Sequence, residues 1–141
     1  MPEMTEKQAI EVLKSLLHSA IAAMPATPSL RPLRRDTQPC TDPITDEDGS
    51  SVTVSRGYWL IGLDPQRTTD YVQALRSHWS ASGFRITADT RPRDRWVVVE
   101  QRDGGYRMSV IVSDTGVLSI SASSPCVAMD DADGHDDGAE P

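Results

Sequence analysis

Residues 58–86, YWLIGLDPQRTTDYVQALRSHWSASGFRI, contain the signals of a strand, a helix and a second strand in direct succession. Asp64 has the side chain of a helix N-cap, and Pro65 suits the first helical position, where its missing N–H costs nothing. Gly83 suits the left-handed residue that ends a helix, and Phe84 can then pack against the last turn. The helix between them carries one apolar stripe at helical spacing, formed by Tyr71, Val72, Leu75 and Trp79.

A second amphipathic helix is predicted near the start of the chain. Thr5 and Gln8 have the spacing of a capping box, and Pro25 ends the apolar run that follows. We expect this helix to pack on the domain's own sheet; the alternative is a detachable helix that docks on a partner. Its narrow stripe is formed by Ile10, Leu13, Leu17, Ala20, Ile21 and Met24.

Alternating apolar residues predict strands on both sides of the central helix. Residues 52–63 form one long strand, in which Gly57 indicates a bulge or bend. Leu30 and Leu33 predict a short edge strand that Pro32 interrupts. Short turns after the helix predict an antiparallel four-strand meander, with strands at 84–88, 96–101, 106–112 and 117–123.

These elements predict a two-layer α+β fold, with an antiparallel sheet of about four to six strands and two helices packed on one face. We expect a single domain over residues 5–126, a disordered start at 1–4 and a disordered acidic tail at 127–141. The net charge of −7 falls to −1 when the six acidic residues after Met129 are left out. The acidity therefore says little about the partner of the folded part.

The two cysteines, Cys40 and Cys126, lie at the edges of the predicted domain, each beside a proline. Their number and spacing fit neither a zinc site nor a Cys-x-x-Cys redox motif. We expect a disulfide that closes the whole domain; the alternative is two buried free thiols. A disulfide would imply an oxidising compartment, either outside the cell or at the outer face of its membrane.

The apolar segment from Ile10 to Met24 is not a secretory or membrane-spanning sequence, because Glu11, Lys14 and His18 interrupt it. If the disulfide forms, we expect a natural precursor that carries a signal upstream of Met1, which would then be an expression start.

The sequence contains no recognisable catalytic constellation. His18 and His78 lie on predicted helices, and His135 lies in the tail. No Gly-x-Ser-x-Gly elbow or phosphate-binding glycine loop is present, and residues 42–51 do not have the ligand spacing of a calcium-binding loop. We therefore predict no enzyme activity, no cofactor and no metal site; a cleft with converging carboxylates or a His–carboxylate pair would reverse that prediction.

The distribution of arginine is the one non-random surface feature of the sequence. Arginine largely replaces lysine, and the only lysines are Lys7 and Lys14. Arginines crowd the predicted turns and outward faces of the meander, where acidic residues lie among them. Arg and Trp are enriched at binding surfaces, and Arg holds anionic groups through two parallel hydrogen bonds. The alternative is a solvated face of mixed charge; nucleic acid is not expected as a partner. The predicted binding residues are Trp79, Arg91, Arg93 and Arg95.

The chain resembles the soluble part of small secreted or lipid-anchored actinobacterial proteins. The resemblance lies in the strand–DP–helix–W…GF–strand core from Gly57 to Ile86, the leading helix, the preference for Arg over Lys and the single Cys pair. The resemblance implies an extracytoplasmic location. It also implies that a lipid-modified cysteine upstream of Met1 anchors the chain to the membrane.

We therefore expect a non-enzymatic cell-envelope or secreted binding module, such as the soluble part of a lipoprotein. Its partner would be a protein or an anionic envelope component. One alternative is a carrier of a small apolar ligand, with a pocket between sheet and central helix lined by Trp59, Tyr71, Leu75 and Trp96. Another alternative, if the thiols are reduced, is an immunity or inhibitor protein inside the cell.

Overall fold

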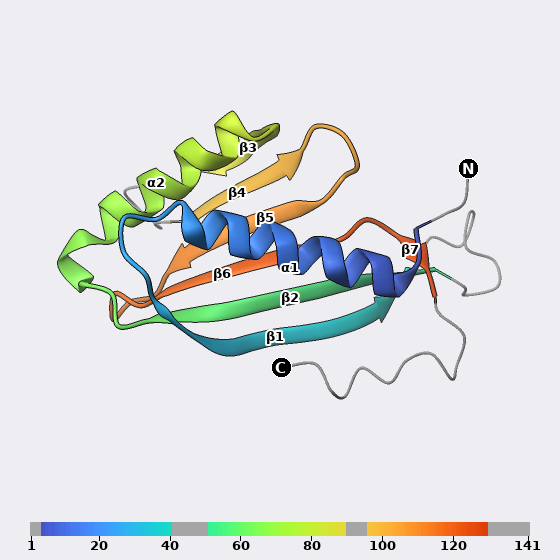
Figure 1. Ribbon diagram of the computed structural model, residues 1–141, viewed down its shortest axis with the longest axis horizontal. Coiled ribbons are helices and arrows are strands. Elements are labelled where there is room, and N and C mark those ends of the chain that lie inside the picture. Colours follow the sequence, from blue (N-terminus) through green and yellow to red (C-terminus); the bar gives the residue numbers. More distant parts are fainter. Residues whose placement is uncertain (1–3, 41–50, 90–95, 130–141) are drawn as a thin grey trace.

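A computed structural model of the chain describes residues 4–40, 51–89 and 96–129, and arranges them in two layers (Figure 1). Two α-helices and a short 3₁₀ turn accompany seven strands in the described part. In chain order the elements are α1 (Glu6–Ala22), β1 (Ser29–Pro39), β2 (Ser51–Ile61), the 3₁₀ turn η1 (Pro65–Arg67), α2 (Thr68–Ala81), β3 (Phe84–Asp89), β4 (Trp96–Gln101), β5 (Arg107–Val112), β6 (Leu118–Ser123) and β7 (Val127–Ala128).

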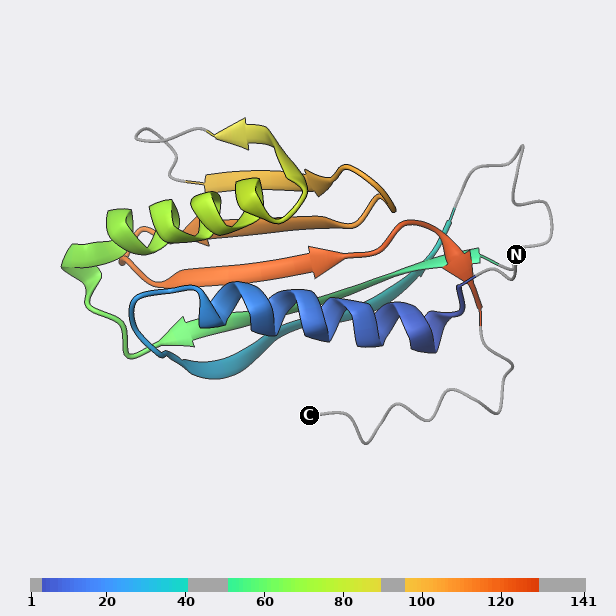
Figure 2. The same ribbon diagram turned by 45° about the horizontal axis from the view of Figure 1, so that its top comes forward.

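All seven strands belong to one antiparallel sheet. Six of them follow the order β1-β2-β6-β5-β4-β3, and β7 pairs with the first two residues of β2. Both helices lie on the same face of this sheet, α1 across β2 and β6 and α2 beside β3 (Figures 1 and 2). The predicted α+β fold and its meander from β3 to β6 are confirmed. The strand count is above the predicted four to six, because β7 joins the first two strands and the four strands of the meander in one sheet.

The core lies between the helices and the sheet, where the predicted stripes meet. Leu13 and Leu17 of α1 and Tyr71 and Trp79 of α2 are at most 2% exposed. Apolar side chains that leave water in this way supply the main favourable free energy of folding. The strands contribute the inward-facing residues of the other half, among them Val54, Leu60, Val97, Val99, Val110 and Ile120.

The helix ends follow the sequence signals, with one difference. In α1 the capping box is complete, since the amide of Gln8 donates to Thr5 Oγ1 and the amide of Thr5 donates to Gln8 Oε1. Asp64 was expected to cap α2, but it caps the 3₁₀ turn η1 by accepting a hydrogen bond from the Gln66 amide at 2.9 Å. The Arg67 amide bonds back to the Asp64 carbonyl. That tighter bond delays the α-helix by one turn.

Strand β1 is longer than the short, interrupted strand that its sequence predicted. It spans eleven residues along one edge of the sheet, and its register to β2 shifts between Pro32 and Arg34. Proline has no N–H to donate, and a bulge of one residue lets pairing resume beyond it. The irregularity predicted from Gly57 therefore lies in the partner strand, where Arg34 pairs with Gly57.

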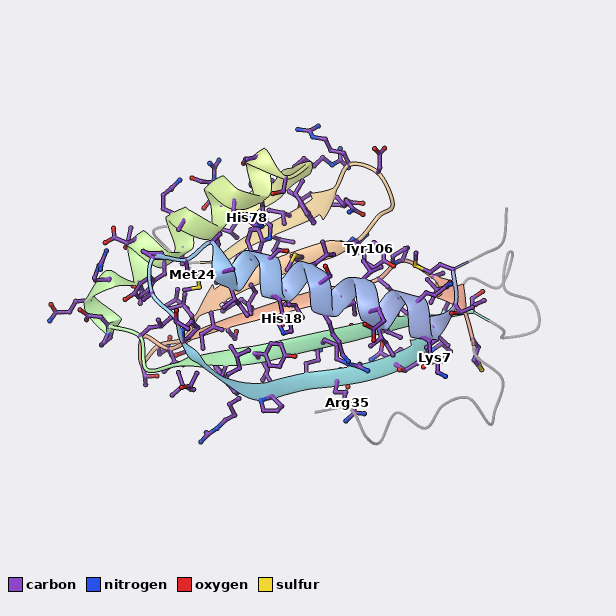
Figure 3. The ribbon with its side chains drawn as sticks, viewed as in Figure 1. Lys7, His18, Met24, Arg35, His78 and Tyr106 are labelled. Atoms are coloured by element: carbon purple, nitrogen blue, oxygen red, sulfur yellow. A yellow bond between two sulfur atoms is a disulfide. The ribbon has the colours of Figure 1, made fainter. Side chains whose placement is uncertain are left out.

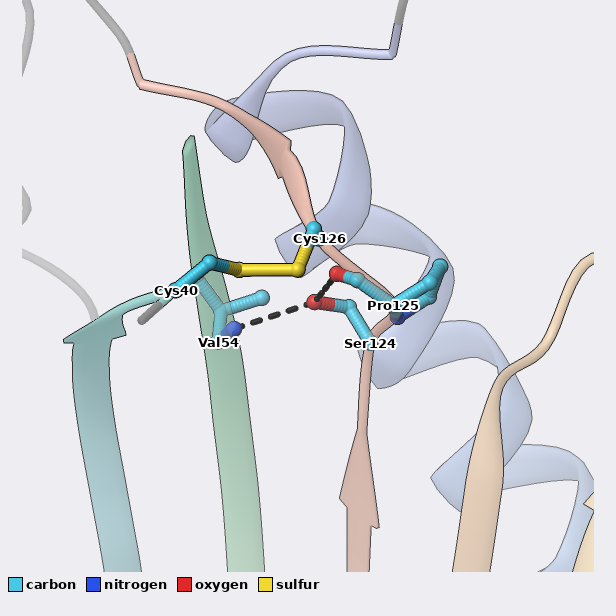
Figure 4. Close-up of a disulfide and its surroundings, with 5 residues drawn as sticks. All are labelled: Cys40, Val54, Ser124, Pro125 and Cys126. Atoms are coloured by element: carbon cyan, nitrogen blue, oxygen red, sulfur yellow. Dashed lines mark hydrogen bonds between the residues drawn. A yellow bond between two sulfur atoms is a disulfide. The ribbon is translucent and has the colours of Figure 1, made fainter. Parts of the chain in front are cut away.

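The predicted disulfide is confirmed between Cys40 and Cys126, whose Cα atoms lie 6.3 Å apart (Figure 4). It joins the end of β1 to the segment that leads into β7. Beside it the Val54 amide donates to Ser124 Oγ at 3.0 Å, and that hydroxyl donates to the Pro125 carbonyl at 2.7 Å. The Ser124 amide also donates to the Val54 carbonyl at 2.9 Å. Two hydrogen bonds thus hold the C-terminal segment against β2, and the disulfide ties it to the end of β1.

The folded part continues beyond residue 126, where the sequence predicted the domain to end. Val127 pairs with Val52, Ala128 pairs with Ser51, and the Ala128 amide donates to the Met4 carbonyl. Val127 is 6% exposed. The disulfide places these residues beside the end of β2, where their backbone groups find partners that the sequence pattern does not reveal.

We expect the double substitution Cys40→Ser/Cys126→Ser to lower the free energy of unfolding by about 4–5 kcal/mol in the chain-entropy model, because the closed loop is long. Denaturant unfolding of the variant and of reduced wild-type protein measures this loss. The two should match, since both lack the same crosslink. An unchanged unfolding midpoint in both would contradict a structural role for the bond.

Candidate functional site

The face of the sheet opposite the helices, here called the open face, carries a row of large apolar side chains. Pairing across β2, β6, β5 and β4 aligns Trp59, Ser119, Ile111 and Trp96. Ile111 is 42% exposed and Trp96 is 39% exposed, whereas Trp59 is half-buried. We call Trp59, Ile111 and Trp96 the apolar row. Ser119 is buried between two of its members, which indicates that their side chains close over it.

Two residues along the strands, the same face becomes polar and hollow. Ser121 of β6 pairs with Gly57 on one side and with Ser109 on the other; Ser123 pairs with Ser55 and Arg107. Because these residues are small, a hollow of about 290 Å³ remains above them. We call the four hydroxyl residues that line it the serine trough: Ser55, Ser109, Ser121 and Ser123.

The backbones approach closely in the middle of the trough. A Cβ atom at Gly57 would lie 2.6 Å from Ser121 Oγ and 3.0 Å from the Ile120 carbonyl oxygen. Real Cβ atoms essentially never come as close as 2.6 Å to another heavy atom. A larger residue would force its neighbours to shift, so space favours glycine here, and its absent side chain leaves the floor of the trough open.

Arginines from two different strands border the trough. Arg34 of β1 forms an exposed ion pair with Asp36 at 3.3 Å. Arg107 of β5 pairs in register with Glu100, but the Glu100 carboxylate lies 3.5 Å from Arg85 instead. Within the described part of the chain, Arg107 has neither an ion pair nor a side-chain hydrogen bond. Its charge is thus directed at solvent in the hollow.

The structure does not place Trp79 at the surface where we predicted it. Its side chain is fully buried beneath α2, and its indole Nε1–H has no hydrogen-bond partner among the described residues. The physical reason is its spacing, because Trp79 lies on the same helical stripe as Tyr71 and Leu75. The three other predicted binding residues, Arg91, Arg93 and Arg95, lie outside the described residues, and their role stays a prediction.

The four residues expected to line an apolar pocket lie on two faces of the sheet. Tyr71 and Leu75 are buried under α2, while Trp59 and Trp96 belong to the open face. Strand alternation explains the separation, since the neighbours of Trp59 along β2 point toward the helices.

The two histidines that the structure describes come from different helices. His18 comes from α1 and His78 from α2 (Figure 3), and neither imidazole takes part in an ion pair there. Tyr106 Oη donates to Met4 Sδ at 2.8 Å, and burial raises the pKa of this phenol. Tyr106 is therefore a neutral hydrogen-bond donor at physiological pH.

The described residues also lack a group of three or more His, Cys, Asp or Glu side chains placed to hold a metal ion. Neither helix of the described part of the chain is long and apolar enough to cross a membrane.

Comparisons with protein-family models, with curated proteins and with solved structures find no match. The open face is thus characterised by its own geometry and charge.

Sequence reasoning missed the serine trough, although one signal for it was present. In residues 118–123 serines alternate with the apolar residues Leu118, Ile120 and Ala122. Such alternation indicates a strand with one hydroxyl-bearing face. The neighbours of those serines could not be named, because the pairing of β6 with β2 joins residues 58 to 68 positions apart.

We expect Gly57→Ala to lower the free energy of unfolding by about 1–3 kcal/mol, as overpacking does in well-packed regions. The same substitution in an unstrained strand would stabilise slightly, because alanine restricts the unfolded chain. Denaturant unfolding of Gly57→Ala in the wild-type and Ser121→Gly backgrounds tests the cause. A cost that is equally large in both backgrounds would show that Ser121 is not the crowding neighbour.

Proposed function

We propose that this protein is a non-enzymatic binding module outside the cytoplasm that holds its partner on the open face of its sheet. The observation that carries the proposal is the apolar row, which crosses the sheet near one end of β2, β5 and β4. It lies on the open face, and both helices cover the other face (Figures 1 and 2). The partner is a protein or an anionic component of the cell envelope. The protein is secreted or anchored to the outer face of the cytoplasmic membrane.

The composition of this face supports a binding role. Trp and Arg are the residues that most often dominate binding free energy, and charged groups usually border an apolar centre at such interfaces. Here Trp59, Ile111 and Trp96 form the centre. Arg34 pairs with Gly57, two positions from Trp59, and Arg107 lies four positions from Ile111 along β5. A contiguous apolar patch rimmed by polar residues is typical of an interaction surface.

The disulfide supports the location. A Cys40–Cys126 bond is consistent with an oxidising environment, because cytosolic thiol systems keep most cysteine pairs reduced. A crosslink that spans 86 positions of the chain also stabilises the folded domain. Such stabilisation suits a protein outside the cell, where no refolding machinery acts on an unfolded domain.

We expect an envelope extract of the source organism to shift the amide NMR signals of the open face, namely those of β2, β4, β5 and β6. Ile111→Asp should weaken the interaction by about tenfold or more, because it places a charge in the apolar centre. Titrations with a soluble protein fraction and with a polysaccharide fraction of that extract distinguish the two classes of partner.

Leu30→Asp is the matched control for this experiment. Leu30 is 40% exposed, similar to Ile111, but it pairs with Leu60 and so belongs to the opposite face. We expect it to change the affinity by no more than about twofold. Shifts confined to the helix side, or equal losses from both substitutions, would overturn the proposed use of the open face.

A further inference from the structure

We propose that the serine trough binds an acidic sugar chain, whose rings carry singly charged acid groups such as carboxylates. This inference rests on the proposed function, because it identifies the ligand class of the same open face. Three features of the trough carry it: an uncompensated charge, hydroxyl groups that the described hydrogen bonds do not use, and the apolar row beside it.

The charge of the trough suits a monoanionic group. Arg34 is compensated by Asp36 at 3.3 Å, and Glu100 compensates Arg85 at 3.5 Å, which leaves Arg107 as the uncompensated charge of the lining. A guanidinium group binds a carboxylate through two parallel hydrogen bonds. Asp36 and Glu100 would repel a group of higher negative charge placed near them.

The hydroxyl groups of the trough are available to a ligand. The described hydrogen bonds do not use the side-chain hydroxyls of Ser55, Ser109, Ser121 or Ser123, all of which line the hollow. Each serine hydroxyl both donates and accepts, as each sugar hydroxyl does. A cluster of such groups on neighbouring strands can therefore bond several hydroxyls of one sugar chain in any donor–acceptor arrangement.

The apolar row supplies the third requirement. Residues two apart on one face of a strand lie about 7 Å apart, so the row borders the end of the trough at Gly57, Ser121 and Ser109. Trp59 follows Gly57 by two positions, and Ile111 follows Ser109 in the same way. Indole and aliphatic surface can pack against the C–H faces of a sugar ring, while the ring hydroxyls point into the trough.

An acidic peptide fits this site less well. Extended peptides gain affinity mainly by adding a strand to an open sheet edge, and the trough lies over β2, β6 and β5, whose backbones are already paired on both sides. The hollow is also shallow and floored by hydroxyls, without the deep apolar pockets that select peptide side chains.

The test measures binding of tetragalacturonate, a four-sugar chain with one carboxylate per ring, by titration calorimetry and by amide NMR shifts. We expect a dissociation constant below about 1 mM with shifts at the trough. Arg107→Glu should weaken binding by about tenfold or more. The double substitution Ser109→Ala/Ser123→Ala keeps the charge and should weaken binding several-fold.

Two controls separate this site from general attraction between opposite charges. Arg102→Glu changes the net charge equally at an exposed arginine of the β4–β5 turn, outside the trough lining, and should alter the affinity by no more than about twofold. Maltotetraose, a neutral chain of the same length, should bind at least about tenfold more weakly, because it cannot engage Arg107. Inorganic polyphosphate supplies charge without sugar rings.

The inference is overturned if tetragalacturonate shows no binding at millimolar concentration, if maltotetraose binds equally well, or if the serine substitutions have no effect. It is also overturned if Arg102→Glu and Arg107→Glu weaken binding equally, or if polyphosphate binds as tightly as tetragalacturonate. Where the sugar chain fails but envelope extract still shifts the open-face signals, the ligand class falls and the proposed function stands. Where both fail, both proposals fall.

Discussion

The register of three central strands is the constraint on which the rest of the molecule depends. Because side chains alternate along a strand, pairing Gly57 with Ser121 and Ser121 with Ser109 fixes the face of every residue in β2, β6 and β5. A slip of one residue would move the apolar row into the core and expose its aliphatic neighbours. The same hydrogen bonds thus determine both the helix-covered core and the composition of the open face.

Several features hold this register in place at the ends of the strands. The disulfide fastens the end of β1 to the segment before β7, and buried Ser124 accepts a hydrogen bond from the Val54 amide. At the outer edge, β1 combines prolines, a bulge and arginines, which discourage the addition of another chain's strand. An exposed edge of eleven residues would otherwise be open to pairing with a strand of another chain.

The sequence was sufficient for the fold class, the helices and the meander, since these depend on local periodicity, caps and short turns. It was insufficient where long-range pairing decides, as in the full length of β1, the addition of β7 and the close approach of Gly57 to Ser121. For the site, the pattern predicted a binding role for arginine and tryptophan on the meander, which stays a prediction. It could not tell Trp79, which is buried, from Trp96, which is exposed, because helical spacing and strand register place them on different faces.

The division of the sheet into two faces explains why small polar residues can occupy its centre. Stability comes from the helix side, where the apolar stripes of α1 and α2 are buried, so the other face is not needed to fill a core. On exposed strand positions β-branched and aromatic residues stabilise a sheet better than serine or glycine does. Serines at 121 and 123 are therefore unfavourable choices for stability alone. They become favourable if the central strands must leave room for a ligand beside a row of aromatic side chains, and that requirement links the packing of this domain to the binding role proposed for it.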